Sequence, residues 1–361
     1  MKRRTAVRTT VLAALCATGI AISAPSQTTP SEPPARTAER IALGRALFFE
    51  SRLSGDGSRS CASCHAPHKG FADGEPLSRG YNRSGHFRNT PSLLAISMKS
   101  RLMWDGRHPA DRLADVVVEM LTSAVTMNGD PQIIVERVRQ LPGLLDAWRR
   151  AYGERRTPDF DGVVEALATY TAAHGNEETA ADRALAGDAG ALSEQAREGL
   201  RLFTGKAGCS GCHSGAAFSD GRLHRLGVPE NPAILRDPER TASLLRHHAI
   251  HGARDPMTER TDTGAQAWTG RVSDRGRFAT PTLRGVAHTA PYMHNGVFAT
   301  LAQVIAFYDR GGGRASELRP LGLDERERAA LLAFLEALSP PLPMEDAPPV
   351  DDYATTAGAG R

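Results

Sequence analysis

Two pentapeptides decide the fold of this chain: CASCH at Cys61–His65 and CSGCH at Cys209–His213. In each, two cysteines stand three positions apart and a histidine follows directly. Two thiols at this spacing can form thioethers with the two vinyl groups of one porphyrin, and the adjacent imidazole can then bind its iron. We therefore expect two c-type haems, attached at Cys61, Cys64, Cys209 and Cys212, with His65 and His213 as the proximal ligands.

Other uses of these cysteines are less consistent with the pattern. The chain has five cysteines, and the four outside the N-terminal segment all belong to the two motifs. Two disulfides would leave the identical spacing and the two histidines as coincidences. A zinc site built from four cysteines would also leave both histidines unexplained.

The N-terminus is typical of an exported protein. A basic start (MKRR), an apolar run (VLAALCATGIAISA, residues 11–24) and small residues near Ser23 together predict a signal peptide over residues 1–23. A retained N-terminal anchor and a lipid-modified Cys16 are weaker alternatives. We expect a periplasmic protein, with residues 24–36 as a linker.

Composition restricts the fold and the partners. Only 6% of the 361 residues are aromatic, whereas Gly (35) and Pro (23) are frequent, which favours helices joined by long turns over a β-sandwich. The net charge is +3 and basic residues are interspersed with acidic ones, so nucleic acid is not an expected partner.

The motifs belong to a longer repeat. Thr37 and Ser193 are candidate caps for a helix before each motif, and FADG and FSDG follow the two motifs. The repeat predicts an all-α fold of two tandem cytochrome c-like domains, residues 37–188 and 189–339, each binding one covalent c-type haem. We expect a disordered tail over residues 340–361, and a solvated loop over 229–261, where a metal site at His247, His248 and His251 is the less favoured alternative.

One helix in each half carries a residue that could reach iron. Apolar residues recur at helical spacing up to Met120 in RLADVVVEM and up to Tyr308 in TLAQVIAFY. Such residues are usually part of a core. Their matched positions in two haem domains make them candidate ligands as well.

The chain resembles the bacterial diheme cytochrome c peroxidases and MauG through CASCH, RNTPSL, WDGR, CSGCH and TPTLRGVAHTAPYMHNG, over about Thr37 to Leu338. The resemblance implies that the N-terminal haem reacts with hydrogen peroxide and that the C-terminal haem relays electrons. Trp104 matches a tryptophan between the haems. Tyr308 matches the distal ligand of the second haem, which is a Met in the peroxidases and a Tyr in MauG.

The resemblance also implies a calcium ion between the domains. Asn89 would bind it through its side chain, and Thr289 and Pro291 would bind it through their carbonyl oxygens. It implies a small cytochrome c or cupredoxin as electron donor, or a protein substrate as in MauG, and members of the family often form homodimers.

Three positions depart from the family pattern. Thr126 stands where relatives have a catalytic Glu, Met120 where they have a distal Pro, and Tyr81 where classical members have a His. A threonine cannot exchange protons with peroxide as a carboxylate can. The leading hypothesis is a periplasmic diheme peroxidase-like oxidoreductase, in which Met120 lines an open pocket. The alternative is a diheme electron-transfer cytochrome without peroxidase activity, in which Met120 binds the first iron.

Overall fold

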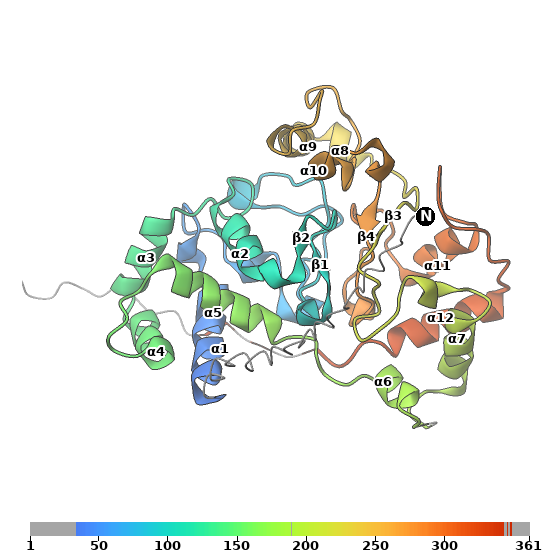
Figure 1. Cartoon of the computed structure of the whole chain (residues 1–361), viewed down its shortest axis with the longest axis horizontal. Helices are drawn as coiled ribbons and strands as arrows, with labels where there is room; N and C mark the ends of the chain where they lie inside the picture. The colour runs from blue at the N-terminus through green and yellow to red at the C-terminus, as the bar shows by residue number, and fades with distance from the viewer. Residues whose placement is uncertain (1–33, 189, 343–344, 346, 349–361) are drawn as a thin grey trace, which may run out of the picture. The chain divides into compact units, whose positions relative to one another are not determined.

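The computed structural model describes residues 34–188, 190–342, 345 and 347–348, and these residues are mostly helical (Figure 1). Within these described residues, sheet is limited to two antiparallel pairs, β1 (Arg101–Leu102) with β2 (His108–Pro109) and β3 (Leu223–His224) with β4 (Phe278–Ala279). The α-helices are α1 (Pro34–Phe49), α2 (Leu113–Thr122), α3 (Pro131–Gln140), α4 (Pro142–Tyr152), α5 (Phe160–Ala172), α6 (Ala180–Leu185), α7 (Glu194–Thr204), α8 (Ala233–Arg236), α9 (Pro238–Ile250), α10 (Gln266–Thr269), α11 (Leu301–Asp309) and α12 (Glu325–Glu336).

Local capping explains where several helices begin. The hydroxyl of Ser193 accepts a hydrogen bond from the backbone of Ala196 at 3.1 Å, which starts α7 as the sequence predicts. Asp324 and Glu327 form a capping box at α12. The structure differs at α1, which begins at Pro34, inside the predicted linker, so Thr37 is a helical residue and not its cap. A proline is compatible with the first helical turn because its missing N–H would have no partner there.

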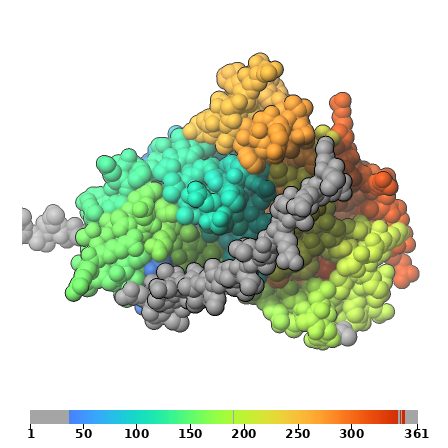
Figure 2. Space-filling model, viewed as in Figure 1, coloured from blue at the N-terminus to red at the C-terminus, as the bar shows by residue number. Residues whose placement is uncertain are grey.

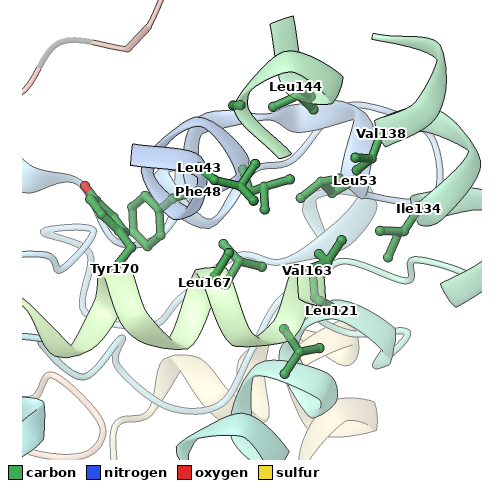
Figure 3. Close-up of a cluster of buried hydrophobic side chains, with 14 of the residues drawn as sticks. Leu43, Phe48, Leu53, Leu121, Ile134, Val138, Leu144, Val163, Leu167 and Tyr170 are labelled. Atoms are coloured by element: carbon green, nitrogen blue, oxygen red, sulfur yellow. The ribbon is translucent and has the colours of Figure 1, made fainter. Parts of the chain in front are cut away.

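The first hydrophobic core lies among α1, α3, α4 and α5 (Figure 3). α1 approaches α5 so closely that a Cβ on Gly44 would lie 2.1 Å from the backbone oxygen of Ala166. A glycine is therefore required at this crossing. It lets α1, the helix before the first motif, pack directly against α5. Cys61 packs against the same core.

The second core repeats this arrangement with α7 and α12. A Cβ on Gly199 in α7 would lie 2.0 Å from the backbone oxygen of Ala330 in α12. Phe203 and Phe334 pack across the crossing with ring centroids 5.0 Å apart, and Cys209 lies against this second core. Each motif thus follows a helix that crosses another helix at a glycine.

The segment expected to be a solvated loop is folded. It contains α8 and α9, and His247 and His248 on α9 are 8% and 0% exposed. The prediction was wrong because Asp237 caps α9 and Pro238 occupies its first position, so a helix forms that buries its histidines.

The predicted disordered tail makes specific contacts where the structure describes it. The backbone oxygen of Pro340 lies 2.8 Å from His288 Nε2, and Leu342 packs against the first core. Farther along, Glu345 accepts a hydrogen bond from the hydroxyl of Tyr170 at 2.7 Å. These partners belong to other parts of the fold, so composition alone could not reveal them.

The predicted signal peptide, residues 1–23, lies outside the described residues. Within the described part of the chain, no helix combines the length and the apolar character needed to cross a membrane.

Candidate functional site: two haem-attachment motifs and the cavity beside the second

The first motif forms a tight turn that orients its histidine. Residues Cys61–Ser63 form a short 3-10 helix, and the backbone N–H of His65 donates to the oxygen of Cys61 at 2.9 Å. The ring nitrogen Nδ1 of His65 lies 3.0 Å from the carbonyl oxygen of Phe71. Because a carbonyl can only accept, Nδ1 carries the proton and Nε2 keeps a free lone pair for a metal ion.

The second motif repeats this geometry. Residues Cys209–Gly211 form the 3-10 helix, and the backbone N–H of His213 donates to Cys209 at 2.9 Å. Nδ1 of His213 donates to the carbonyl of Phe218, again at 3.0 Å. Phe71 and Phe218 both have a positive φ, 56° and 48°, which points each carbonyl towards its histidine.

The protonation of these side chains suits haem attachment. Burial lowers the pKa of His65 and of His213, so both imidazoles are neutral, as iron ligands must be. Burial raises the pKa of Cys61 to about 12 and that of Cys209 to about 11. All four motif cysteines are free of disulfides.

A cavity of ≈ 660 Å³ adjoins the second motif. Its volume is of the size of a cofactor site. Its lining brings together eight of the residues singled out from the sequence: Asn89, Trp104, Cys209, Cys212, His213, Thr289, Pro291 and Tyr308. Cys61, Cys64, His65, Met120 and Thr126 are not part of this lining.

Trp104 and Asn89 are tied together at the edge of this cavity. The indole N–H of Trp104 donates to the backbone oxygen of Asn89 at 2.9 Å. The side-chain amide nitrogen of Asn89 donates to the oxygen of Glu75 at 2.8 Å, so its Oδ1 remains available as an oxygen ligand. Thr289 and Pro291 line the same cavity, so an amide oxygen and backbone carbonyls that could bind calcium lie around one space.

Thr126 and Met120 are connected to each other rather than to an acid or base. The hydroxyl of Thr126 donates to the backbone oxygen of Met120 at 2.6 Å. The side chain of Met120 packs against Ile96, Leu102 and Val116. The neighbouring Glu119 accepts a hydrogen bond from His108 at 2.9 Å and pairs with Arg107. The hydroxyl of Thr126 thus stabilises the end of α2.

A buried ion network holds the WDGR segment in place. Arg88 donates to Asp105 at 2.7 Å and to Asp262 at 2.6 and 2.8 Å. Arg107 pairs with the same Asp105 at 3.0 Å. Because Arg88 and both aspartates are 5% exposed or less, the network fixes Trp104, the residue before Asp105, against the segment that carries Asp262.

Sequence reasoning did not single out the basic residues of the cavity. Lys99 and Arg225 both line it, and burial lowers the pKa of Lys99 to about 8. Nε of Arg225 is buried without a hydrogen-bond partner. Cations facing this space are suited to the two carboxylates of a haem. No sequence signal distinguishes them, because the chain contains 44 Lys and Arg residues.

Among the described residues, the one group of metal-binding side chains with ligand spacing is Cys212, Asp220 and His224. The ring of His224 bonds to Asp220 through Nε2 at 2.8 Å, and Cys212 is a cysteine of the second motif. The group therefore adjoins the haem-attachment site, and it does not include the three histidines on and after α9.

Comparisons with known proteins show the family of this chain. A family model described as di-haem cytochrome c peroxidase matches residues 38–190. The chain is 46% identical over 324 residues to a protein named cytochrome-c peroxidase IdrP2 from Denitromonas iodatirespirans, which covers 89% of this chain and 87% of that protein. It is 34% identical over 306 residues to the methylamine utilization protein MauG of Methylorubrum extorquens, which covers 84% and 78%.

A solved structure shows the same fold. A MauG-like protein associated with microbial copper homeostasis superimposes with a TM-score of 0.71 at 26% identity, over 88% of this chain and 96% of that one. Together with the relatives above, this match establishes the family. The chain belongs to the di-haem cytochrome c peroxidase and MauG family of peroxidase-like oxidoreductases.

Proposed function

We propose that this protein carries two covalent haems c in tandem cytochrome c-like domains and reduces hydrogen peroxide. The observation that carries the proposal is the repeated motif geometry. In both halves a pair of free thiols adjoins a neutral histidine whose Nδ1 is held by a carbonyl at 3.0 Å. This arrangement leaves Nε2 of His65 and of His213 as the proximal ligand of one haem iron each.

The second haem would occupy the cavity beside Cys209 and Cys212. His213 and Tyr308 both line this space and would bind its iron. Burial raises the pKa of Tyr308 far above its usual value, so the phenol is neutral unless a metal ion displaces its proton. A phenolate ligand favours the higher oxidation states of iron, which makes this haem a store of oxidising equivalents as well as a relay.

In the proposed reaction, peroxide would react at the N-terminal haem, and Trp104 would carry electrons between the two haem sites. When bound, the haems supply the redox chemistry. The protein holds the indole of Trp104 in one orientation through its bond to Asn89. A calcium ion bound by Asn89, Thr289 and Pro291 would keep this segment against the cavity.

The cellular location and the electron donor are expectations from the sequence and the family. We propose that the protein acts in the periplasm after export. Its electrons would come from a small cytochrome c or a cupredoxin, or from a protein substrate that it oxidises in the manner of MauG. Tyr308 favours the second choice, because MauG shares a tyrosine at this position.

A specific observation favours a second candidate, a diheme electron-transfer cytochrome without peroxidase activity. The hydroxyl proton of Thr126 is already donated to Met120, and Glu119 is bound by Arg107 and His108. None of these groups offers a free proton for breaking the O–O bond. In this alternative the sulfur of Met120 would bind the first iron.

Electron paramagnetic resonance of the resting oxidised protein distinguishes the peroxidase from the electron-transfer cytochrome. A high-spin ferric signal beside a low-spin signal is the expected result, because an open first haem leaves a position for peroxide. Two low-spin signals, together with no rapid spectral change on adding hydrogen peroxide, would establish the electron-transfer cytochrome instead.

The role of Tyr308 has its own test. We expect Tyr308→Met to raise the midpoint potential of the second haem, because a thioether stabilises ferrous iron and a phenolate stabilises ferric iron. Spectroelectrochemical titration of both haems measures the change, and the first haem is the internal control. An unchanged midpoint would remove Tyr308 from the iron's coordination.

A further inference from the structure

The hydroxyl of Tyr170, on α5, is hydrogen-bonded to a carboxylate from the C-terminal segment. It donates to Oε2 of Glu345 at 2.7 Å, and the two residues are 175 positions apart in the sequence. Nε of Arg45 lies 3.3 Å from the same oxygen. The phenol proton of Tyr170 therefore points at a group that can take it up. Tyr292 differs, because its hydroxyl donates at 3.1 Å to the peptide carbonyl of Val286, which is too weak a base to accept a proton.

Tyr170 lies in the core that also holds the first haem-attachment motif. Its ring is 1% exposed, and Cys61 packs against the same core. Burial raises the pKa of Tyr170 far above its usual value, and Glu345 and the nearby thiol of Cys61 add to this shift. Figure 3 shows Tyr170 beside Phe48, with its hydroxyl directed away from the aliphatic side chains. Figure 2 shows the helices around this core, in teal to green, as one packed surface, so the ring is enclosed by protein.

Aromatic rings connect Tyr170 to the residue that orients His65. The ring centroid of His174 is 4.5 Å from that of Tyr170 and 4.5 Å from that of Phe71. Phe48 makes a second connection, at 5.0 Å from Tyr170 and 6.1 Å from Phe71. The carbonyl of Phe71 accepts the hydrogen bond from Nδ1 of His65 at 3.0 Å. These contacts form a short, buried route for an electron between Tyr170 and the first iron ligand.

The groups around the hydroxyl favour the loss of an electron together with a proton. The raised pKa keeps the phenol of Tyr170 protonated at rest. A phenol that has lost an electron is a much stronger acid, so a base within hydrogen-bond distance then takes its proton. Burial lowers the pKa of His174, so the neighbouring imidazole is neutral and places no positive charge beside the ring. The side chains of Glu345 and Arg45 are 22% and 37% exposed, so water can solvate Arg45 when Glu345 becomes neutral.

We propose that Tyr170 and Glu345 form a proton-coupled redox site, which holds one oxidising equivalent of hydrogen peroxide beside the first haem-attachment motif. The proposal rests on the peroxidase function above. Hydrogen peroxide takes up two electrons on reduction to water; Tyr170 supplies one and the haem sites supply the other. As its electron leaves, the O–H bond of Tyr170 breaks and its proton forms an O–H bond with Oε2 of Glu345, which leaves a neutral phenoxyl radical. The step reverses when the electron donor returns one electron.

Electron paramagnetic resonance tests the site in the full-length protein with both haems. The protein receives one equivalent of hydrogen peroxide without an electron donor and is rapidly frozen. A second sample contains ring-deuterated tyrosine, which narrows the signal of a tyrosyl radical and leaves that of a tryptophan radical unchanged. We expect a deuterium-sensitive signal in the wild type and at least tenfold less of it in Tyr170→Phe. Tyr292→Phe is the matched control and should keep the wild-type yield.

Glu345→Gln tests the proton acceptor separately. The amide oxygen can still accept the hydrogen bond from Tyr170, but it cannot take up the proton, so we expect at least tenfold less radical. In the wild type, the radical should form at least twofold more slowly in D₂O, because an O–H bond breaks in the step. Haem absorbance confirms that each variant holds its haems; if Glu345→Gln does not, the isotope effect and the Tyr170→Phe result decide.

Peroxide consumption in the same samples distinguishes failure of the redox site from failure of the proposed function. Consumption without a tyrosyl signal, or with a signal that persists fully in Tyr170→Phe, would overturn the redox site alone. A full signal in haem-loaded Glu345→Gln would also overturn it, because the carboxylate would then not be the proton acceptor. Absence of peroxide consumption would overturn the proposed function and the redox site with it.

Discussion

At the scale of single residues, hydrogen bonds decide what a side chain can do. His65 and His213 are ligand candidates because a carbonyl fixes the proton on Nδ1. Thr126 is a poor proton donor to peroxide because Met120 already accepts its hydrogen bond. His247 represents a third case, since its Nε2 is buried without a hydrogen-bond partner and is 3.8 Å from Asp105.

The titration of His247 yields a prediction on acid stability. Burial, with the nearby charge of Arg88, lowers its pKa to about 2 in the folded protein, whereas the unfolded chain has the usual value near 6.5. Its contribution to stability is complete above pH 6.5 and is lost as the pH falls towards 2, because only the unfolded state takes up the proton.

His247→Phe should therefore reduce the pH dependence of the free energy of unfolding by up to about 1.4 kcal/mol per pH unit below pH 6.5. Denaturant titrations of the wild type and the variant at pH 7.5, 6.0 and 5.0 measure this slope. Phenylalanine removes no hydrogen bond and can pack against Phe87, whose ring lies 5.1 Å from that of His247. Parallel pH profiles for both proteins would show that His247 titrates normally.

At the scale of elements, the fold depends on two helix crossings that each require a glycine. Gly44 lets α1 contact α5, and Gly199 lets α7 contact α12. Each crossing sets the direction in which the chain leaves its helix and enters a haem-attachment motif. An added methyl group at such a crossing meets backbone atoms that cannot rotate away.

Gly199→Ala should destabilise the protein by about 2 kcal/mol, although alanine is the better helix former. The loss arises because the new Cβ would lie 2.0 Å from the oxygen of Ala330 and would force α7 and α12 apart. Gly190→Ala is the matched control, because its nearest contact is a side-chain oxygen of Asp188 at 3.4 Å, and we expect a change below about 0.5 kcal/mol. Thermal unfolding of both variants with haems bound compares them; equal stability would contradict the crossing argument.

At the scale of the whole molecule, contacts between distant parts of the sequence position the WDGR segment. Arg88 joins Asp105 to Asp262, and Asp262 is 174 residues from Arg88 in the chain. The C-terminal segment adds a second long-range connection, since Glu345 accepts from Tyr170 and pairs with Arg45 at 3.3 Å. The orientation of Trp104 thus depends on a contact between segments far apart in the sequence, the one that Arg88 makes between Asp105 and Asp262.

Asp262→Asn should cost about 3 kcal/mol, because it leaves the guanidinium of Arg88 buried with only one of its two carboxylate partners. Glu198→Gln provides the comparison, since its pair with Arg201 is exposed and should contribute less than about 1 kcal/mol. Denaturant unfolding of both variants gives the two values. A loss below about 1 kcal/mol for Asp262→Asn would show that the network adds little to stability.

Much of the candidate site could be predicted from local sequence. The two motifs, the caps at Ser193 and Asp324, and the family resemblance all depend on residues close together in the chain. In the 229–261 segment, Asp237 and Pro238 are local signals for a helix, but the burial of its histidines could not be predicted in this way, because it depends on packing against distant residues such as Phe87. Lys99 and Arg225, the basic residues of the cavity, could not be predicted either, because nothing in the sequence distinguishes them from the other Lys and Arg residues.

The sequence by itself determined the positions of the two C-x-x-C-H motifs, the helical class and the family, because residue spacing and helical periodicity are local properties. Only the tertiary structure decided which side chains already have hydrogen-bond partners and which face a cavity. It bound the hydroxyl of Thr126 to Met120, gathered Asn89, Trp104 and Tyr308 around one cavity, and placed Glu345 against Tyr170. These outcomes depend on distances between residues far apart in the chain, and such distances exist only after the helices have packed.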